Sequence, residues 1–167
     1  MKTLILVRHA KSDWSHEGLS DTERPLNDRG RKDAPEMAKR LRKKGLKVDL
    51  FLSSPAKRAF RTARFFADEF EVKKDDIRVE KSLYGAMPSQ FAAVLSALKD
   101  KEDTVALFSH NPGITEFANS LCEVRTDNIP TCGVFAVQAD VAGWKEFIKA
   151  EKKFLFYDYP KNPLGVL

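Results

Sequence analysis

Cysteine is scarce in this chain, and long apolar runs are missing from it. The two cysteines, Cys122 and Cys132, match no paired spacing of a metal or redox site, so we expect reduced thiols. The N-terminal stretch "MKTLILVRHA" is too short and too quickly charged for a signal peptide or a membrane span. These absences predict a cytoplasmic protein without a membrane partner.

Two classes of cofactor site are also unsupported by the sequence. No Gly-x-Gly-x-x-Gly fingerprint follows the first apolar run, which argues against a dinucleotide enzyme. No cluster of Asp and Glu suggests a required divalent ion. We therefore expect neither a metal nor an organic cofactor.

The charge is basic, with a net value of +5, and the densest cationic run spans Lys39 to Lys47. Such a run can bind nucleic acid. Read as a helix, however, it places Ala34, Met37 and Leu41 on one face and the cations around the other. Aromatic residues for base stacking do not interleave with the cations, so a solvated helix face is favoured and no nucleic-acid partner is expected.

The length of 167 residues suits a single domain over residues 1–167 with a substantial core. Apolar runs typical of strands alternate with amphipathic segments, which predicts the α/β class: a three-layer α/β/α sandwich around a mostly parallel sheet. No convincing helix separates the last two strands, "CGVFAVQAD" and "KKFLFYDY". One of them is therefore expected to pair antiparallel at an edge.

Three helices have recognisable start or stop signals. The segment 28–45 is predicted to end near Gly45, with Pro35 tolerated near its start or at a bend. The next helix is expected to begin with Ser54 as N-cap and Pro55 in the first turn. A third is expected to begin at Asn111 and Pro112.

Residues with chemically active side chains follow the ends of the predicted strands. Arg8 and His9 follow the first strand, Arg58 lies in the first turn after the second, and His110 and Asn111 follow a later one. Because ligands of open parallel sheets bind outside the carboxyl ends of the strands, these side chains should meet. Guanidinium groups and helix N-termini together suit a phosphate.

Each residue taken alone has a simpler interpretation. A histidine at a strand end is more often a structural hydrogen bonder than a catalyst. Arg58 could be a surface arginine, and His110 could bond only its neighbouring backbone. The joint pattern favours an anion site, because separate strand ends deliver cationic or imidazole groups to one edge.

Three motifs, in order along the chain, resemble the histidine phosphatase superfamily: "LVRHA", "SSPAKRAFRTA" and "LFSHNPG". That family shares an Arg-His-Gly motif, a Ser-Pro-x-x-Arg-x-x-x-Thr segment and a second histidine after a late strand. The segment "ERPLNDRG" and the short chain resemble its small branch, the SixA-like phosphohistidine phosphatases. The resemblance implies a phosphoglycerate mutase-like fold.

The resemblance also implies roles for individual residues. His9 matches the nucleophile that takes the phosphoryl group, and Arg8, Arg58 and His110 match the phosphate pocket, with Asn111 beside them. Two arginines and an imidazolium would stabilise charge during phosphoryl transfer. Ala10 stands where the family usually has glycine, and its methyl group could narrow the approach to the phosphate.

Larger family members keep a glutamate that protonates the leaving oxygen. The comparable region here is "EKSLYGAMPS", where Glu80 is either that acid or, more simply, surface charge. Without such an acid, easier leaving groups such as the imidazole of phosphohistidine are favoured.

The loop after the nucleophile offers candidates for the pocket mouth. Candidates that could line it, or be ordinary loop residues, are Ser12, Asp13, Trp14, Ser15 and His16. Arg24 could reach the phosphate, or form a salt bridge with Asp21 or Asp28. Thr62 lies one turn beyond Arg58 and is expected to support that arginine.

The sequence thus predicts a metal-independent phosphatase with a covalent phosphohistidine intermediate on His9. Its expected substrate is a phosphohistidine-bearing protein domain. A small phosphorylated metabolite remains the alternative substrate. A non-catalytic phosphate-binding module is the alternative from another class, although binding alone would not need a nucleophile beside Arg8.

Overall fold

The computed structural model describes residues 1–163. The last four residues of the predicted domain, 164–167, lie outside this part, so the domain boundary stays a prediction. Within residues 1–163 the strands form a six-stranded sheet in the order β3-β2-β4-β1-β5-β6. The strands are β1 (Lys2–Arg8), β2 (Leu50–Ser53), β3 (Arg78–Val79), β4 (Thr104–Ser109), β5 (Val134–Ala139) and β6 (Lys153–Asp158).

The sheet is mostly parallel, as predicted. β1 pairs with β4, β4 with β2, and β2 with β3, all in parallel. β5 pairs antiparallel with both β1 and β6. The expected antiparallel edge is confirmed, with β6 as the edge strand and β5, one place inward, as the reversed strand. The short helix α5 (Trp144–Lys149) lies between them along the chain.

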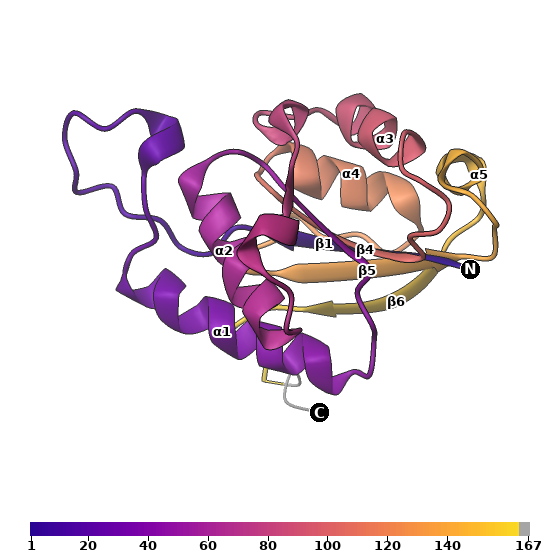
Figure 1. Ribbon diagram of the computed structural model, residues 1–167, viewed down its shortest axis with the longest axis horizontal. Helices are drawn as coiled ribbons and strands as arrows, with labels where there is room; N and C mark the ends of the chain where they lie inside the picture. The colour runs from indigo at the N-terminus through magenta and orange to yellow at the C-terminus, as the bar shows by residue number, and fades with distance from the viewer. Residues whose placement is uncertain (164–167) are drawn as a thin grey trace.

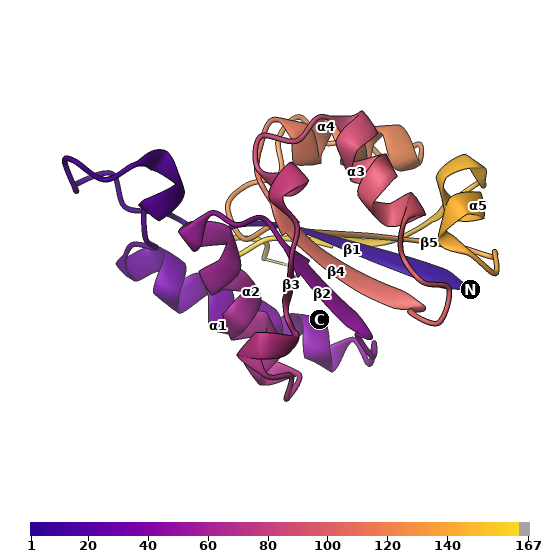
Figure 2. The same cartoon turned by 45° about the horizontal axis from the view of Figure 1, so that its top comes forward.

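β1 explains why both faces of the sheet carry helices. Its residues Leu4 to Val7 are fully buried and alternate between two apolar clusters, since successive side chains of a strand point to opposite faces. One cluster continues into α3, α4 and α5, and the other into α1 and α2. Figures 1 and 2 show these two groups of helices on opposite sides of the sheet. The remaining bounds are α1 (Asp28–Lys43), α2 (Lys57–Glu69), α3 (Pro88–Ser96) and α4 (Gly113–Leu121).

α1 departs from the prediction at Pro35. The helix begins at Asp28, where the Asn27 side chain accepts a bond from the Gly30 N–H at 2.9 Å, so Pro35 lies well inside it. The strong cap and the buried apolar face therefore outweigh the hydrogen bond that proline cannot donate. Gly45 follows the helix with φ of 79°, as suits the residue after a helix end.

Two helix starts also differ from the prediction. α2 begins at Lys57 with Ala56 as its N-cap, not at Ser54. α4 begins at Gly113 with Pro112 as its N-cap, not at Asn111. Ser54 Oγ accepts from the Ala56 N–H at 3.3 Å but also contacts His110, and the Asn111 side chain bonds Thr115, Asn128 and Ile129, because both residues belong to the site described below.

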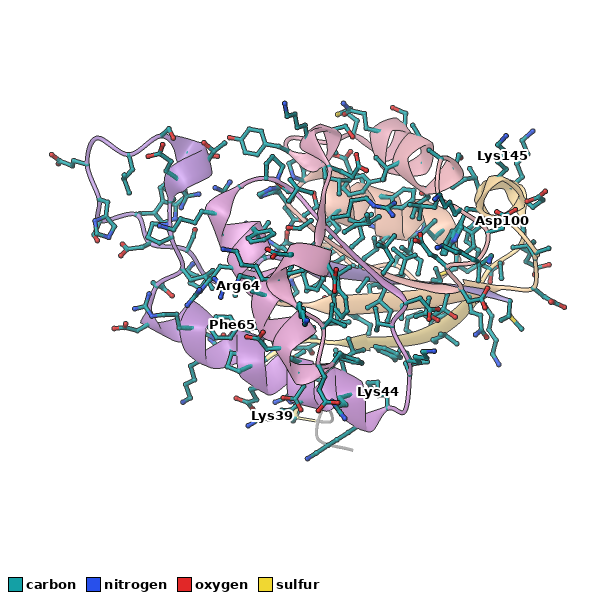
Figure 3. All side chains as sticks on the ribbon, viewed as in Figure 1. Lys39, Lys44, Arg64, Phe65, Asp100 and Lys145 are labelled. Atoms are coloured by element: carbon teal, nitrogen blue, oxygen red, sulfur yellow. The ribbon has the colours of Figure 1, made fainter. Side chains whose placement is uncertain are left out.

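The basic run of α1 is partly used inside the chain. Arg40 forms ion pairs with Glu36 and Asp158, and the Lys44 ammonium lies 4.4 Å from the centre of the Phe156 ring. Figure 3 labels Lys39 on α1 and Lys44 just beyond the end of that helix. The cations Lys39, Arg42, Lys43 and Lys47 of the same run are exposed, as expected for a solvated helix face. Among residues 1–163, no helix combines the length and apolar character that crossing a bilayer requires.

Candidate active site

The carboxyl ends of β1 and β4 bring the two predicted histidines together. Arg8 lies beside Ser109 in the sheet, and the His9 N–H donates to the Ser109 carbonyl at 3.1 Å. The residues just beyond these strands, His9 and His110, have ring centres 5.1 Å apart. Because β1 is buried on both faces, the tip that carries His9 is firmly held.

A cavity of about 280 Å³ opens at this edge. Its lining residues are Arg8, His9, Lys11, Ser12, Trp14, Asp21, Arg24, Arg58, His110, Asn111 and Thr131. The structure therefore gathers both predicted histidines and both predicted arginines around one space, with the predicted mouth residues Ser12 and Arg24. Their chemical roles stay predictions.

The His9 ring is oriented by its own backbone. Its Nδ1 lies 2.8 Å from the Ala10 carbonyl oxygen, which can only accept, so Nδ1 carries the proton. In the neutral ring the lone pair is then on Nε2. Burial, followed by the charges of His110 and Arg58, lowers the pKa of His9 to about 3. A lowered pKa favours the neutral form of the His9 imidazole.

The pKa of His110 is lowered as well, which favours a neutral ring over the imidazolium expected from the sequence. Burial, followed by the charge of Arg58, lowers its pKa to about 4. Its Nε2 lies 2.7 Å from Ser54 Oγ, while Nδ1 is buried without a hydrogen-bond partner among residues 1–163. A buried polar atom of this kind is costly unless a ligand satisfies it. This cost favours a hydrogen-bonding group, such as a water molecule, at Nδ1.

We expect both rings to remain neutral at about pH 6, where free histidine is largely charged. The unfolded chain binds these protons and the folded chain does not. The free energy of unfolding should therefore fall as the pH drops from about 6.5 toward about 4. Nitrogen-resolved NMR of the imidazoles checks the charge states, and either ring titrating near its ordinary pKa would contradict them.

Asp21 joins several of the polar groups around the cavity. Arg58 donates to its carbonyl oxygen at 2.6 Å and to Oδ2 at 2.9 Å, and Arg24 Nε donates to Oδ1 at 3.1 Å. Arg24 also donates to Ser12 Oγ at 2.6 Å. The salt-bridge alternative for Arg24 is therefore present, and Arg24 lines the cavity too. Asp21 fixes both guanidinium groups in place.

Tyr84 joins this network through contacts with Asp21 and His110. Its hydroxyl donates to Asp21 Oδ2 at 2.5 Å, and its ring meets His110 edge-on at 5.5 Å. The bond from Tyr84, with those from Arg58 and Arg24, lowers the pKa of the Asp21 carboxyl. The bond to Asp21 in turn raises the pKa of the Tyr84 hydroxyl. Asp21 is thus held ionised and is a poor proton donor.

Arg8 is anchored from the β5 side. It donates to the Ile129 carbonyl at 2.9 Å, and burial lowers its pKa. The Cys132 N–H donates to the carbonyl oxygens of both Arg8 and His9 at 3.0 Å. Cys132 has φ of 62°, in the left-handed region that non-glycine residues rarely adopt. The Cys132 backbone thus fixes the carbonyl groups of Arg8 and His9 through hydrogen bonds.

Ala10 does not narrow the cavity. Its side chain is fully buried within the α1–α2 core and is not among the lining groups. Its N–H donates at 2.9 Å to Thr62 Oγ, and that hydroxyl donates at 2.7 Å to the Arg58 carbonyl. Thr62 thus ties the strand end to the first turn of α2, consistent with its expected support of Arg58.

Asn111 joins the start of α4 to the loop before β5. Its Oδ1 accepts from Thr115 Oγ at 2.6 Å, and its Nδ2 donates to Asn128 Oδ1 at 2.6 Å and to the Ile129 carbonyl at 3.0 Å. Asn111 lines the cavity, but these bonds occupy its amide. Its proposed phosphate contact would require one of them to open.

Two residues considered in the sequence lie outside the cavity lining. Asp13, predicted at the mouth, accepts bonds from the Ser15 N–H and hydroxyl at 2.7 and 2.6 Å and lies 3.2 Å from His16. It therefore holds a turn of the exposed loop. Glu80 is also not among the lining groups, and its N–H donates to the Ser53 carbonyl at 2.9 Å.

The sequence reasoning missed three groups. The sequence predicts Asp21 only as a salt-bridge partner and Ser54 only as a helix cap, and it assigns no role to Tyr84. Asp21 lies three residues before Arg24, and this spacing was the available signal. Among residues 1–163, no group of three or more His, Cys, Asp or Glu side chains is placed to hold a metal ion.

Comparison with known proteins identifies the family. Residues 4–84 match the histidine phosphatase superfamily, branch 1. An uncharacterised chloroplast protein of Arabidopsis thaliana is 31% identical over 153 residues, covering 87% of this chain and 70% of that protein. The chain belongs to the histidine phosphatase superfamily.

The superfamily relatives include a phosphatase of a small metabolite. Phosphoserine phosphatase 1 of Hydrogenobacter thermophilus is 38% identical over 95 residues, covering 52% of this chain and 43% of that protein. The structure of the protein histidine phosphatase SixA complexed with tungstate superposes with a TM-score of 0.79 at 22% identity, over 95% of this chain and 97% of that one. The fold is thus shared with SixA, and the histidine phosphatase described here is a hydrolase of the phosphatase class.

Proposed function

We propose that this histidine phosphatase removes phosphate from protein phosphohistidine, through a covalent intermediate on His9 and without a metal ion. The observation that carries the proposal is the neutral His9 ring. Its Nδ1 is bonded to the Ala10 carbonyl, which leaves Nε2 free within a cavity also lined by Arg8 and Arg58. Such a nucleophile beside two guanidinium groups suits in-line phosphoryl transfer.

In the first step His9 Nε2 attacks the substrate phosphorus. The new N–P bond forms while the P–N bond to the substrate imidazole breaks, and the leaving nitrogen keeps the electron pair and takes a proton from water. Arg8 and Arg58 neutralise the charge on the phosphoryl oxygens. They supply the positive charge that a metal ion supplies in other phosphatases.

In the second step a water molecule attacks the phosphorus and the bond to His9 breaks. The electron pair returns to Nε2, and inorganic phosphate leaves. His110 is neutral, with Nδ1 free of partners among residues 1–163. With Nε2–H donating to Ser54 Oγ, Nδ1 holds the lone pair, and we assign it to take a proton from the attacking water as the new P–O bond forms and to release that proton to solvent.

The choice of substrate rests on the leaving group. Asp21 is the carboxylate among the cavity-lining residues, and its bonds to Tyr84, Arg58 and Arg24 keep it ionised. It cannot readily give a proton to a departing alkoxide. Imidazole leaves more easily, so phosphohistidine suits the site better than a serine or sugar phosphate. The free thiols of Cys122 and Cys132 support a reducing, cytoplasmic setting.

A substrate panel tests the proposal. A phosphohistidine phosphotransfer domain, phosphoserine and common sugar phosphates are assayed in EDTA, with His9→Ala as the blank. We expect the phosphohistidine domain to be dephosphorylated at least about 10²-fold faster, the contribution a missing general acid would make for the other substrates. Faster turnover of a small metabolite would favour the metabolite phosphatase. Activity lost in EDTA and restored by magnesium would contradict the metal-independent mechanism.

A further inference from the structure

Trp14 is unusually exposed for so large an apolar side chain. It is 74% exposed, yet it lines the mouth of the cavity. Figures 1 and 2 show its loop projecting away from the sheet beside the site. Large aromatic side chains that remain open to water at a binding site commonly contact a ligand or partner.

The Trp14 ring is nevertheless held in place. The Arg24 guanidinium carbon lies 3.4 Å from the ring centre, and Arg24 is itself 8% exposed. Arg24 is fixed by its bonds to Ser12 and Asp21. The stack covers part of one ring face and leaves most of the indole open. A preorganised aromatic surface thus stands beside the phosphate cavity.

We propose that Trp14 stacks on a planar aromatic leaving group, the imidazole ring of phosphohistidine, while the phosphoryl group lies at His9. The inference rests on the proposed function and assigns a specificity residue to it. An imidazole ring bound to phosphorus is flat and apolar on both faces, so it can lie against an indole without further polar partners. Phosphates without a ring gain nothing from this surface.

The alternative role for Trp14 is structural, through Arg24. In that case loss of the indole would disturb Arg24 and lower the turnover of every phosphorylated substrate by a similar factor. Stacking on the leaving group would affect only substrates that carry a ring. The two roles can therefore be separated by comparing a substrate with a ring and one without.

The experiment uses N-phosphohistidine and phosphoramidate, which share the P–N bond but differ in the ring. Trp14→Leu, Trp14→Phe and the control Leu19→Ala are assayed on both, and inhibition by vanadate is measured as a second ringless probe. Leu19 is 40% exposed on the same loop and does not line the cavity. We expect Trp14→Leu to lower kcat/KM for phosphohistidine about tenfold, as for loss of one aromatic stack.

The same variant should leave phosphoramidate turnover and the vanadate inhibition constant within about twofold, because neither probe carries a ring that could lose a stacking contact. Trp14→Phe should retain most of the phosphohistidine activity, because phenylalanine keeps an aromatic face. Equal losses on both substrates, or no loss on either, would overturn the stacking role. Failure of the wild-type protein to hydrolyse either substrate would instead overturn the proposed function.

Discussion

Replacing His9 by alanine is expected to lower phosphohistidine turnover by roughly 10⁴-fold or more, the scale seen when an enzymatic nucleophile is removed. The variant keeps the arginines and His110, so phosphate can still bind. The variant lacks His9 Nε2, the nitrogen to which we assign the attack. In the wild type this nitrogen keeps its lone pair because Nδ1 donates to the Ala10 carbonyl, and the His9 ring lines the same cavity as Arg8. Steady-state kinetics and a phosphate-binding measurement on the same protein separate the two effects.

His16→Ala is the matched control for this change. His16 is an exposed histidine of the neighbouring loop, paired with Asp13 and not part of the cavity lining. Its replacement should leave turnover within about twofold, since surface substitutions rarely matter. If His9→Ala kept substantial turnover while folding normally, the covalent mechanism would be wrong.

Arg58→Ala is expected to give the second largest loss, about 10²- to 10³-fold in kcat, as for removal of one preorganised donor to developing charge. The loss in kcat should exceed any rise in KM, because the guanidinium is fixed by Asp21 before substrate arrives. Arg58→Lys should recover only part of the rate, since an ammonium cannot keep both bonds to Asp21 and still present a planar fork.

Arg61→Ala supplies the control on the same helix. Arg61 is exposed, and its guanidinium lies 5.3 Å from the centre of the Phe65 ring. We expect Arg61→Ala to retain wild-type kinetics. We also expect Arg58→Ala to remain folded, which chemical denaturation checks. Turnover of Arg58→Ala within about twofold of wild type, under roughly 0.5 kcal/mol of barrier, would show that Arg58 does not act on the phosphoryl group.

Much of the fold could be predicted from the sequence because its signals are local and repeated. The fully apolar run Leu4 to Val7 indicates a strand buried on both faces, and such strands belong to sheets covered by helices on both sides. The rule that ligands bind beyond the strand ends is then enough to place His9 and His110 at one edge of the sheet. Both inferences depend only on the pattern of apolar residues and on the order of strands and helices along the chain.

The parts that could not be predicted depend on side-chain direction. Ser54 and Asn111 have the residue types of helix caps, yet each bonds across the chain, to His110 and to the loop at 128–129. The buried direction of the Ala10 methyl and the convergence of Arg24 and Arg58 on Asp21 are likewise tertiary properties. No pattern in a single sequence states where such groups point.

The helix boundaries also depend on both local sequence signals and tertiary contacts. Pro35 is a local signal against a helix interior, and it is overridden because Ala34, Met37 and Leu41 of α1 are buried against the sheet. A proline inside a helix destabilises it by a few kcal/mol. Burial of a large apolar side chain such as Met37 or Leu41 stabilises the fold by about 1.5–3 kcal/mol each. The expected pattern of the core was therefore more reliable than the expected helix ends.

The most direct test of the mechanism is to trap phosphate on the enzyme. The wild-type protein is mixed with a labelled phosphohistidine domain, quenched within milliseconds in alkali, and the phosphorylated peptide is mapped. We expect acid-labile, alkali-stable phosphate on His9, which disappears in His9→Ala and accumulates when the second step is slowed by His110→Ala. Trapped phosphate on any other residue of the chain would contradict it.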